Sequence, residues 1–80
     1  MNAFYPLTLS PVNAQIFKVL SKQGEHVGNL KQIGGVWKFK AIGYGADGGV
    51  IPGGGPLTTR HNTTFDVLDA ALISRVLALA

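Results

Sequence analysis

The chain has 80 residues, a mass of 8.4 kDa, a formal net charge of +3 and no cysteine, and 46% of its residues are hydrophobic. A single domain of this size buries only about 62% of the surface that its unfolded chain exposes. Disulfides are excluded, and two histidines beside four carboxylates do not favour a structural zinc site. We therefore expect no metal or cofactor, and we expect a second subunit to supply the missing burial.

The same composition predicts a folded protein that does not enter membranes. Charged residues make up 14% of the chain, whereas disordered chains are rich in charge and poor in apolar groups. No apolar run approaches the roughly 20 residues that span a bilayer. Residues 1–9 contain no Lys or Arg and are interrupted by Pro6, so they lack the pattern of an export signal. We therefore expect a cytoplasmic location.

The chain reads as a single domain of four segments. These are an extended lead-in, an antiparallel β-meander, a Gly-rich loop and a helix, over residues 1–14, 15–51, 52–62 and 63–80. The first strand of the meander covers residues 15–21, where Phe17 and Val19 share one face and Lys18 lies on the other. A turn containing Gly24 follows, because glycine adopts positive φ at no steric cost.

The next two strands form the clearest hairpin. Residues 26–33 and 36–44 flank Gly34 and Gly35, which suit a type I′ turn because both of its central positions need positive φ. Alternation along residues 36–44 divides their side chains between two faces. One face carries Trp37, Phe39 and Ala41, and the other carries Lys38, Lys40, Ile42 and Tyr44. After a turn at residues 46–49, residues 50–51 predict a short fourth strand that Pro52 ends or confines to an edge.

Residues 11–23 also fit a helix, with Ser10 as its N-cap and Gly24 as its C-terminal stop. That alternative produces the order helix, three strands, helix, which is similar to a double-stranded-RNA-binding domain. Such a domain is expected to begin its last helix with lysines, whereas this chain reads Thr-Thr-Phe-Asp at residues 63–66, so no residue or activity carries over. The β-rich run at residues 16–19 favours the strand.

Residues 63–80 predict the only helix of the preferred interpretation. Thr63 and Asp66 have the spacing of a capping box, and Asp66 and Asp69 place negative charge at the positive end of the helix dipole. One apolar stripe should cover the sheet, and it contains Phe65, Leu68, Leu72, Val76 and Leu79. The predicted fold class is therefore α+β, a small antiparallel β-meander of three to four strands packed against one C-terminal helix.

A second apolar strip on this helix predicts an oligomer interface. Its members are Val67, Ile73 and Leu77. A helix that is apolar around so much of its circumference is usually buried on more than one side. Since one small sheet cannot cover both strips, we expect a two-fold homodimer.

The Gly-rich loop is a candidate anion or small-ligand site. Backbone N–H groups at a helix N-terminus bind anions, and nearby side chains add donors. The candidate ligands are Arg60, His61, Thr63 and Thr64. A flexible loop with a polar helix cap explains the same residues without any ligand.

One face of the predicted meander is a candidate nucleic-acid surface. Lys18, Lys38, Lys40 and Tyr44 point the same way, and basic residues interleaved with an aromatic ring can follow a phosphate backbone and stack a base. Exposed strands also carry lysines simply to remain solvated and to discourage edge pairing.

The chain has no Cys and no Ser in a recognisable nucleophile motif. Because nothing in it indicates covalent catalysis, the sequence does not favour an enzyme. The leading hypothesis is a small non-catalytic module that acts through protein–protein contact as a homodimer. The alternative is nucleic-acid binding through the basic face. A third hypothesis is anion binding at the Gly-rich loop.

Overall fold

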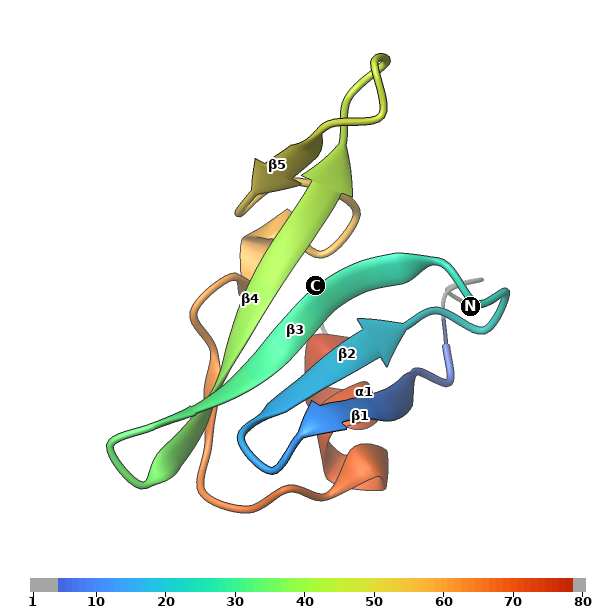
Figure 1. Ribbon diagram of the computed structural model, residues 1–80. Helices are drawn as coiled ribbons and strands as arrows, with labels where there is room; N and C mark the ends of the chain where they lie inside the picture. The colour runs from blue at the N-terminus through green and yellow to red at the C-terminus, as the bar shows by residue number, and fades with distance from the viewer. Residues whose placement is uncertain (1–4, 79–80) are drawn as a thin grey trace.

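The computed structural model describes residues 5–78 as one antiparallel sheet with a helix on one face (Figure 1). The sheet has six strands, with order β1-β2-β3-β4-β5, and β6 pairs with the other end of β4. The elements are β1 Thr8–Asn13, β2 Ile16–Leu20, β3 His26–Ile33, β4 Val36–Tyr44, β5 Val50–Pro52, the 3-10 turn η1 Thr58–Arg60, β6 Thr64–Phe65 and α1 Ala70–Leu77. The predicted α+β meander with one C-terminal helix is confirmed.

The predicted lead-in contains a strand. Residues 8–13 form β1, which pairs with β2 through partners that include Ser10 and Lys18. β1 is an edge strand, where Pro11 is tolerated because a missing N–H on the outer side breaks no ladder bond. Since β1 and β2 together occupy residues 8–20, the helical alternative for residues 11–23 is wrong, and with it the resemblance in element order.

The β3–β4 hairpin has the predicted bounds and the predicted turn. Gly34 and Gly35 have φ values of 57° and 84°, the left-handed pair that a type I′ turn requires. Ile33 pairs with Val36 across this turn, and the register continues to Gly28 opposite Ala41. The turn therefore determines which side chains of β3 and β4 stand next to one another.

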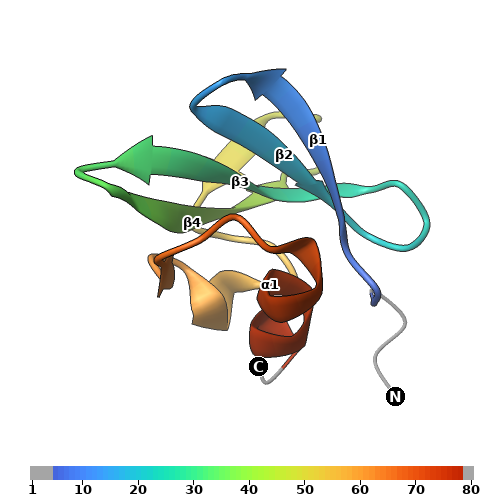
Figure 2. The ribbon, with the colours of Figure 1, turned by 90° about the horizontal axis from the view of Figure 1, so that it is seen from below.

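The core lies between the sheet and α1 (Figure 2). The predicted inward face of β4 is confirmed, because Trp37, Phe39 and Ala41 are all buried. The Phe17 ring meets Trp37 edge to face, with ring centroids 5.5 Å apart. Gly28 leaves the space that the Phe39 ring occupies, since a Cβ there would collide with the ring.

The helix begins seven positions later than the sequence predicts. Residues 64–65 form β6 opposite Trp37 and Lys38, and α1 starts at Ala70. Its N-cap is Asp69, whose carboxylate accepts a hydrogen bond from the Leu72 N–H at 3.1 Å. The predicted capping box is wrong, because residues 64–65 satisfy the edge of β4 by pairing with it and therefore form a strand instead of the first turn of a helix.

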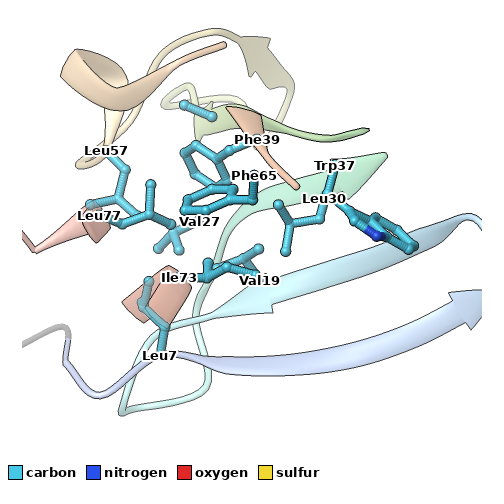
Figure 3. Close-up of a cluster of buried hydrophobic side chains, with 11 residues drawn as sticks. Leu7, Val19, Val27, Leu30, Trp37, Phe39, Leu57, Phe65, Ile73 and Leu77 are labelled. Carbon is cyan, nitrogen blue, oxygen red and sulfur yellow. The ribbon is translucent and has the colours of Figure 1, made fainter. Parts of the chain in front are cut away.

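The assignment of Ile73 and Leu77 to an oligomer interface is also wrong. Both side chains are fully buried within the monomer, where they point into the core cluster (Figure 3). Because α1 starts late, the strip that contains Ile73 and Leu77 faces the sheet, whereas Leu72 and Val76 lie at the flanks of the helix and are half-buried. Val67 precedes the helix and is 56% exposed. No helix within residues 5–78 has the length and apolar character needed to cross a membrane.

Candidate functional site

The face of the sheet opposite α1 carries two rows of aligned side chains, and we call it the outer face. The first row crosses four strands, with Lys18 opposite both Ser10 and Asn29, and Asn29 opposite Lys40. The second row places Lys31 between Ile16 and Lys38, with Thr64 of β6 beyond Lys38. Directly opposed side chains on one face have Cβ atoms about 4.5–5.5 Å apart. The lysines of three neighbouring strands therefore form one basic surface.

Positive charge on the outer face has no carboxylate within the strands to offset it. Lys31 and Lys38 are direct cross-strand partners, an arrangement that destabilises a sheet because like charges repel. Every carboxylate of the chain lies outside the strands, in turns or in the connection to α1; these residues are Glu25, Asp47, Asp66 and Asp69. An anion that lies over this pair would reduce the repulsion between the two lysines.

A bulge brings His26 onto the outer face. The register between β2 and β3 shifts beside Leu20, so Val27 and Leu30 both point into the core although they are three residues apart. His26 and Asn29 consequently emerge together, and the His26 Nε2 lies 2.8 Å from the Asn29 Oδ1. Because the amide oxygen can only accept, the imidazole Nε2 is the donor. The Tyr44 hydroxyl lies 3.4 Å from the Nδ1 of the same ring.

His61 and Asn62 complete the edge of β4 between β5 and β6. The Ala41 N–H donates to the His61 Nδ1 at 3.0 Å, so this imidazole takes the place that a strand carbonyl would occupy. Asn62 has a φ of 74°, which asparagine tolerates, and its Oδ1 accepts from the Lys40 Nζ at 2.6 Å. Lys40 is thus held at the rim of the outer face by a segment distant in sequence.

Two adjoining hollows open beside these residues. The first has a volume of about 440 Å³ and is bordered by Glu25, His26, Val27, Ile42, Gly43, Tyr44, Gly55 and Pro56. The second has a volume of about 350 Å³ and is bordered by Asn29, Lys31, Lys40, Ala41, Ile42, Pro52, Gly53 and His61. Ile42 borders both, so the hollow that Tyr44 lines is next to the hollow that Lys31 and Lys40 line.

Known proteins provide no further guide to this surface. No protein-family model, curated protein or solved structure matches the chain. Its function therefore has to be argued from the site itself.

The structure separates the residues of the predicted anion site. His61 borders the second hollow, whereas Arg60 lies on the α1 side near Tyr5, whose hydroxyl donates to the Leu77 carbonyl at 2.6 Å. The Thr63 hydroxyl donates to the Arg60 carbonyl, and Thr64 belongs to β6. Since α1 begins at Ala70 with Asp69 as its N-cap, the Gly-rich loop does not lead into a helix N-terminus, and the helix-dipole argument for this candidate site no longer applies.

Glycines of the loop and of β4 allow close backbone packing. A Cβ at Gly43 would stand 2.6 Å from the Gly55 nitrogen, and one at Gly55 would collide with the Ile42 carbonyl. The loop backbone therefore crosses directly over β4 on the side of Gly43, and Gly55 and Pro56 border the first hollow.

The predicted basic set of Lys18, Lys38, Lys40 and Tyr44 lies on the outer face, and the structure adds Lys31, Asn29 and His26. Lys31 could have been found from sequence, because a two-residue turn at Gly34 and Gly35 sets it opposite Lys38. His26 could not, since its place depends on the bulge. Within residues 5–78, no group of three or more His, Cys, Asp or Glu side chains could hold a metal ion.

Proposed function

We propose that this protein binds nucleic acid by holding the phosphate backbone on its outer face. The directly opposed pair of Lys31 and Lys38 carries the proposal, because a sheet that tolerates this repulsion gains when an anion lies over the pair. Lys18 and Lys40 extend the charge along the neighbouring row. Phosphate contacts of this kind supply most of the affinity of proteins that bind nucleic acids without base specificity.

The other side chains of the outer face also favour nucleic acid over a simple anion. Ser10 and Asn29 can hydrogen-bond phosphate or sugar, and Tyr44 can stack on a base. Positive charge interleaved with an aromatic ring is the composition of surfaces that follow single strands. A cytoplasmic location, which the sequence suggests, would bring such a surface into contact with RNA and DNA.

Binding to a short fluorescein-labelled oligonucleotide, followed by fluorescence anisotropy over a salt series, tests the proposal. Four phosphate contacts predict a slope of log K against log salt of about −2.8 for a single strand, at about 0.7 per contact. Affinity should then fall about 50-fold between about 50 and about 200 mM salt. Polyglutamate is the competitor that separates nucleic acid from acidic protein. No binding at low salt, or equal competition by polyglutamate, would overturn the proposal.

Lys31→Glu is the most informative variant because it should weaken binding without destabilising the fold. The substitution removes the phosphate contact of Lys31, and the new carboxylate pairs with Lys38 and so removes a second contact. The salt slope should therefore become shallower by about 1.4, and the affinity should fall at least about tenfold. The matched control is Lys22→Glu, which makes the same charge change in the exposed turn between β2 and β3. An equal loss from both variants would mean that net charge, and not the outer face, determines binding.

Protein–protein contact is a second proposal, supported by the β4–β5 hairpin that projects from the sheet (Figure 1). Val50 is 55% exposed and Ile51 is 49% exposed beside Tyr44. These side chains replace Ile73 and Leu77 as candidates for a homodimer contact. Light scattering of the protein and of a Val50→Ser, Ile51→Ser variant tests this, and a monomer at high concentration in both would contradict the dimer.

A further inference from the structure

The first hollow is lined largely by apolar and aromatic residues. Tyr44, which is 52% exposed, lines it together with Ile42 and Gly43 of β4 and Gly55 and Pro56 of the loop. Glu25, His26 and Val27 at the start of β3 complete its border. The Tyr44 hydroxyl lies 3.4 Å from the Nδ1 of His26, which also borders the hollow. Tyr44, Ile42 and Pro56 offer aromatic and apolar contact, and the Glu25 carboxylate repels an anion, so this lining favours a planar aromatic group over a phosphate.

Basic side chains lie next to this hollow along the same strand. Lys40 stands two residues before Ile42 on β4, a separation of about 7 Å along a strand. The second hollow, which Lys40 and Lys31 border, shares Ile42 with the first. A negatively charged group held by these lysines would therefore be adjacent to a planar group in the first hollow. A nucleotide carries both groups, joined by its sugar.

The geometry points to a binding site for an unpaired base of a single-stranded nucleic acid, stacked on Tyr44 in the first hollow with its phosphate at Lys31 and Lys40. This inference rests on the proposed function and makes it more specific. A base inside a duplex has both faces covered by its neighbours, so it cannot enter the hollow, whereas a base in a single strand can. The lysine rows alone would bind single strands and duplexes alike, and the hollow would make the protein prefer single strands.

Anisotropy with three labelled probes tests the inference: a single strand, a duplex of the same sequence, and the same single strand lacking its bases. We expect Tyr44→Ala to weaken single-strand binding about 5- to 150-fold, the range that one stacked base contributes, and to leave duplex and abasic binding unchanged. The matched control is Tyr44→Phe, which keeps the stacking ring and should lose little.

The outcomes distinguish this inference from the proposed function. If Lys31→Glu weakens binding while Tyr44→Ala does not, the phosphate surface stands and the base site is wrong. Equal affinity of the wild-type protein for single strand and duplex would also overturn the base site. No binding of any probe would remove both.

A second measurement covers the case in which a Tyr44 variant folds poorly. In NMR spectra of the wild-type protein, a short single strand should shift the Ile42 methyl groups and the amides of Gly43 and Gly55, which border the first hollow. The abasic strand should shift the signals of Lys31 and Lys38 but not these. Shifts confined to the lysines with both strands would contradict the base site.

Discussion

The two faces of the sheet use the same strands for opposite purposes. Val19, Leu30 and Phe39 are fully buried on the α1 side, whereas their strand neighbours Lys18 and Lys31 are exposed on the outer face. Successive residues of a strand point to opposite faces, so a change of one residue in position moves a side chain from core to surface. If the outer face binds a partner as proposed, substitutions on the two faces should have different effects, with the inner face governing stability and the outer face governing binding.

The two faces also differ in what covers them. α1 and Leu57 close the inner face, and the edge of β4 is completed by β5, β6 and the side chain of His61. Within residues 5–78, no helix lies over the outer face, where Ile42 is buried beside the Gly-rich loop. The outer face therefore combines a fixed backbone with an accessible surface, which is the combination that a binding site needs.

The largest expected effect is on the inner face, from Leu77→Ala. This side chain is fully buried, so its truncation should lower the free energy of unfolding by about 2–5 kcal/mol, measured by urea denaturation. Val67→Ala is the matched control from the same predicted strip and should change stability by less than about 0.5 kcal/mol, because Val67 is exposed. Similar losses from both variants would contradict the burial of Leu77 within the monomer.

Gly28→Ala should have the next largest effect, about 1–3 kcal/mol, because the inner face has no room for a methyl group at this position. The added Cβ would collide with the Phe39 ring and stand 2.8 Å from the Lys40 carbonyl oxygen. Thermal unfolding measures the loss. Adding Phe39→Leu should recover part of it, so the double variant should be less destabilised than the sum of the single ones. Strict additivity would show that the ring is not the obstacle.

Asp69→Ala should cost about 1 kcal/mol, because it removes the side-chain cap of the short helix that closes the inner face. Asp66→Ala is the control for the alternative in which the helix starts at residue 63, and we expect it to be close to neutral. Urea denaturation of the two variants compares the two helix starts. A larger loss from Asp66→Ala would favour the earlier start.

A substitution on the outer face should raise stability. Lys31→Glu replaces a like-charge pair with an opposite-charge pair, so the free energy of unfolding should increase by about 0.2–1 kcal/mol at low salt. The gain should shrink as salt screens the pair. A stabilised fold with weakened binding is the signature of a surface organised for a partner. A loss of stability would contradict the direct opposition of Lys31 and Lys38.

The smallest expected effect is a pH dependence on the α1 side. Burial raises the pKa of Tyr5, and the nearby charge of Arg60 opposes part of this shift. Because the folded state keeps this proton more tightly than the unfolded chain, the contribution to stability is complete below about pH 10 and is lost as pH rises through the folded pKa. Urea midpoints on both sides of about pH 10 should fall less in Tyr5→Phe than in the wild type. An identical fall would assign the effect to other groups.

Much of the sheet was predictable because its signals are local. Alternation separates Phe39 from Lys40, and a Gly-Gly turn sets the register of the hairpin, so the strand bounds and the inward face of β4 follow from neighbouring residues. Most of the basic surface was predictable for the same reason. The hollows were not, because Gly55 and Pro56 come to border the first one only when the loop crosses β4.

The start of the helix could not be predicted from neighbouring residues alone. Thr63 and Asp66 have the spacing of a capping box, and residues 64–65 alone do not reveal that they will pair with Trp37 and Lys38. The choice depends on an open edge of β4 that exists only in the folded sheet. Because residues 64–65 pair with that edge, α1 begins later, and the strip that contains Ile73 and Leu77 faces the core.

By itself, the sequence determined the strand alternation, the Gly-Gly turn, the presence of a C-terminal helix and a face rich in lysine, because each depends on residues close together in the chain. Only the tertiary structure shows where the helix begins, which of its side chains are core, how the bulge brings His26 onto the outer face, and how the Gly-rich loop crosses β4 to border the first hollow. These features depend on pairing an open strand edge and filling one core, and such free energies arise only when distant segments meet.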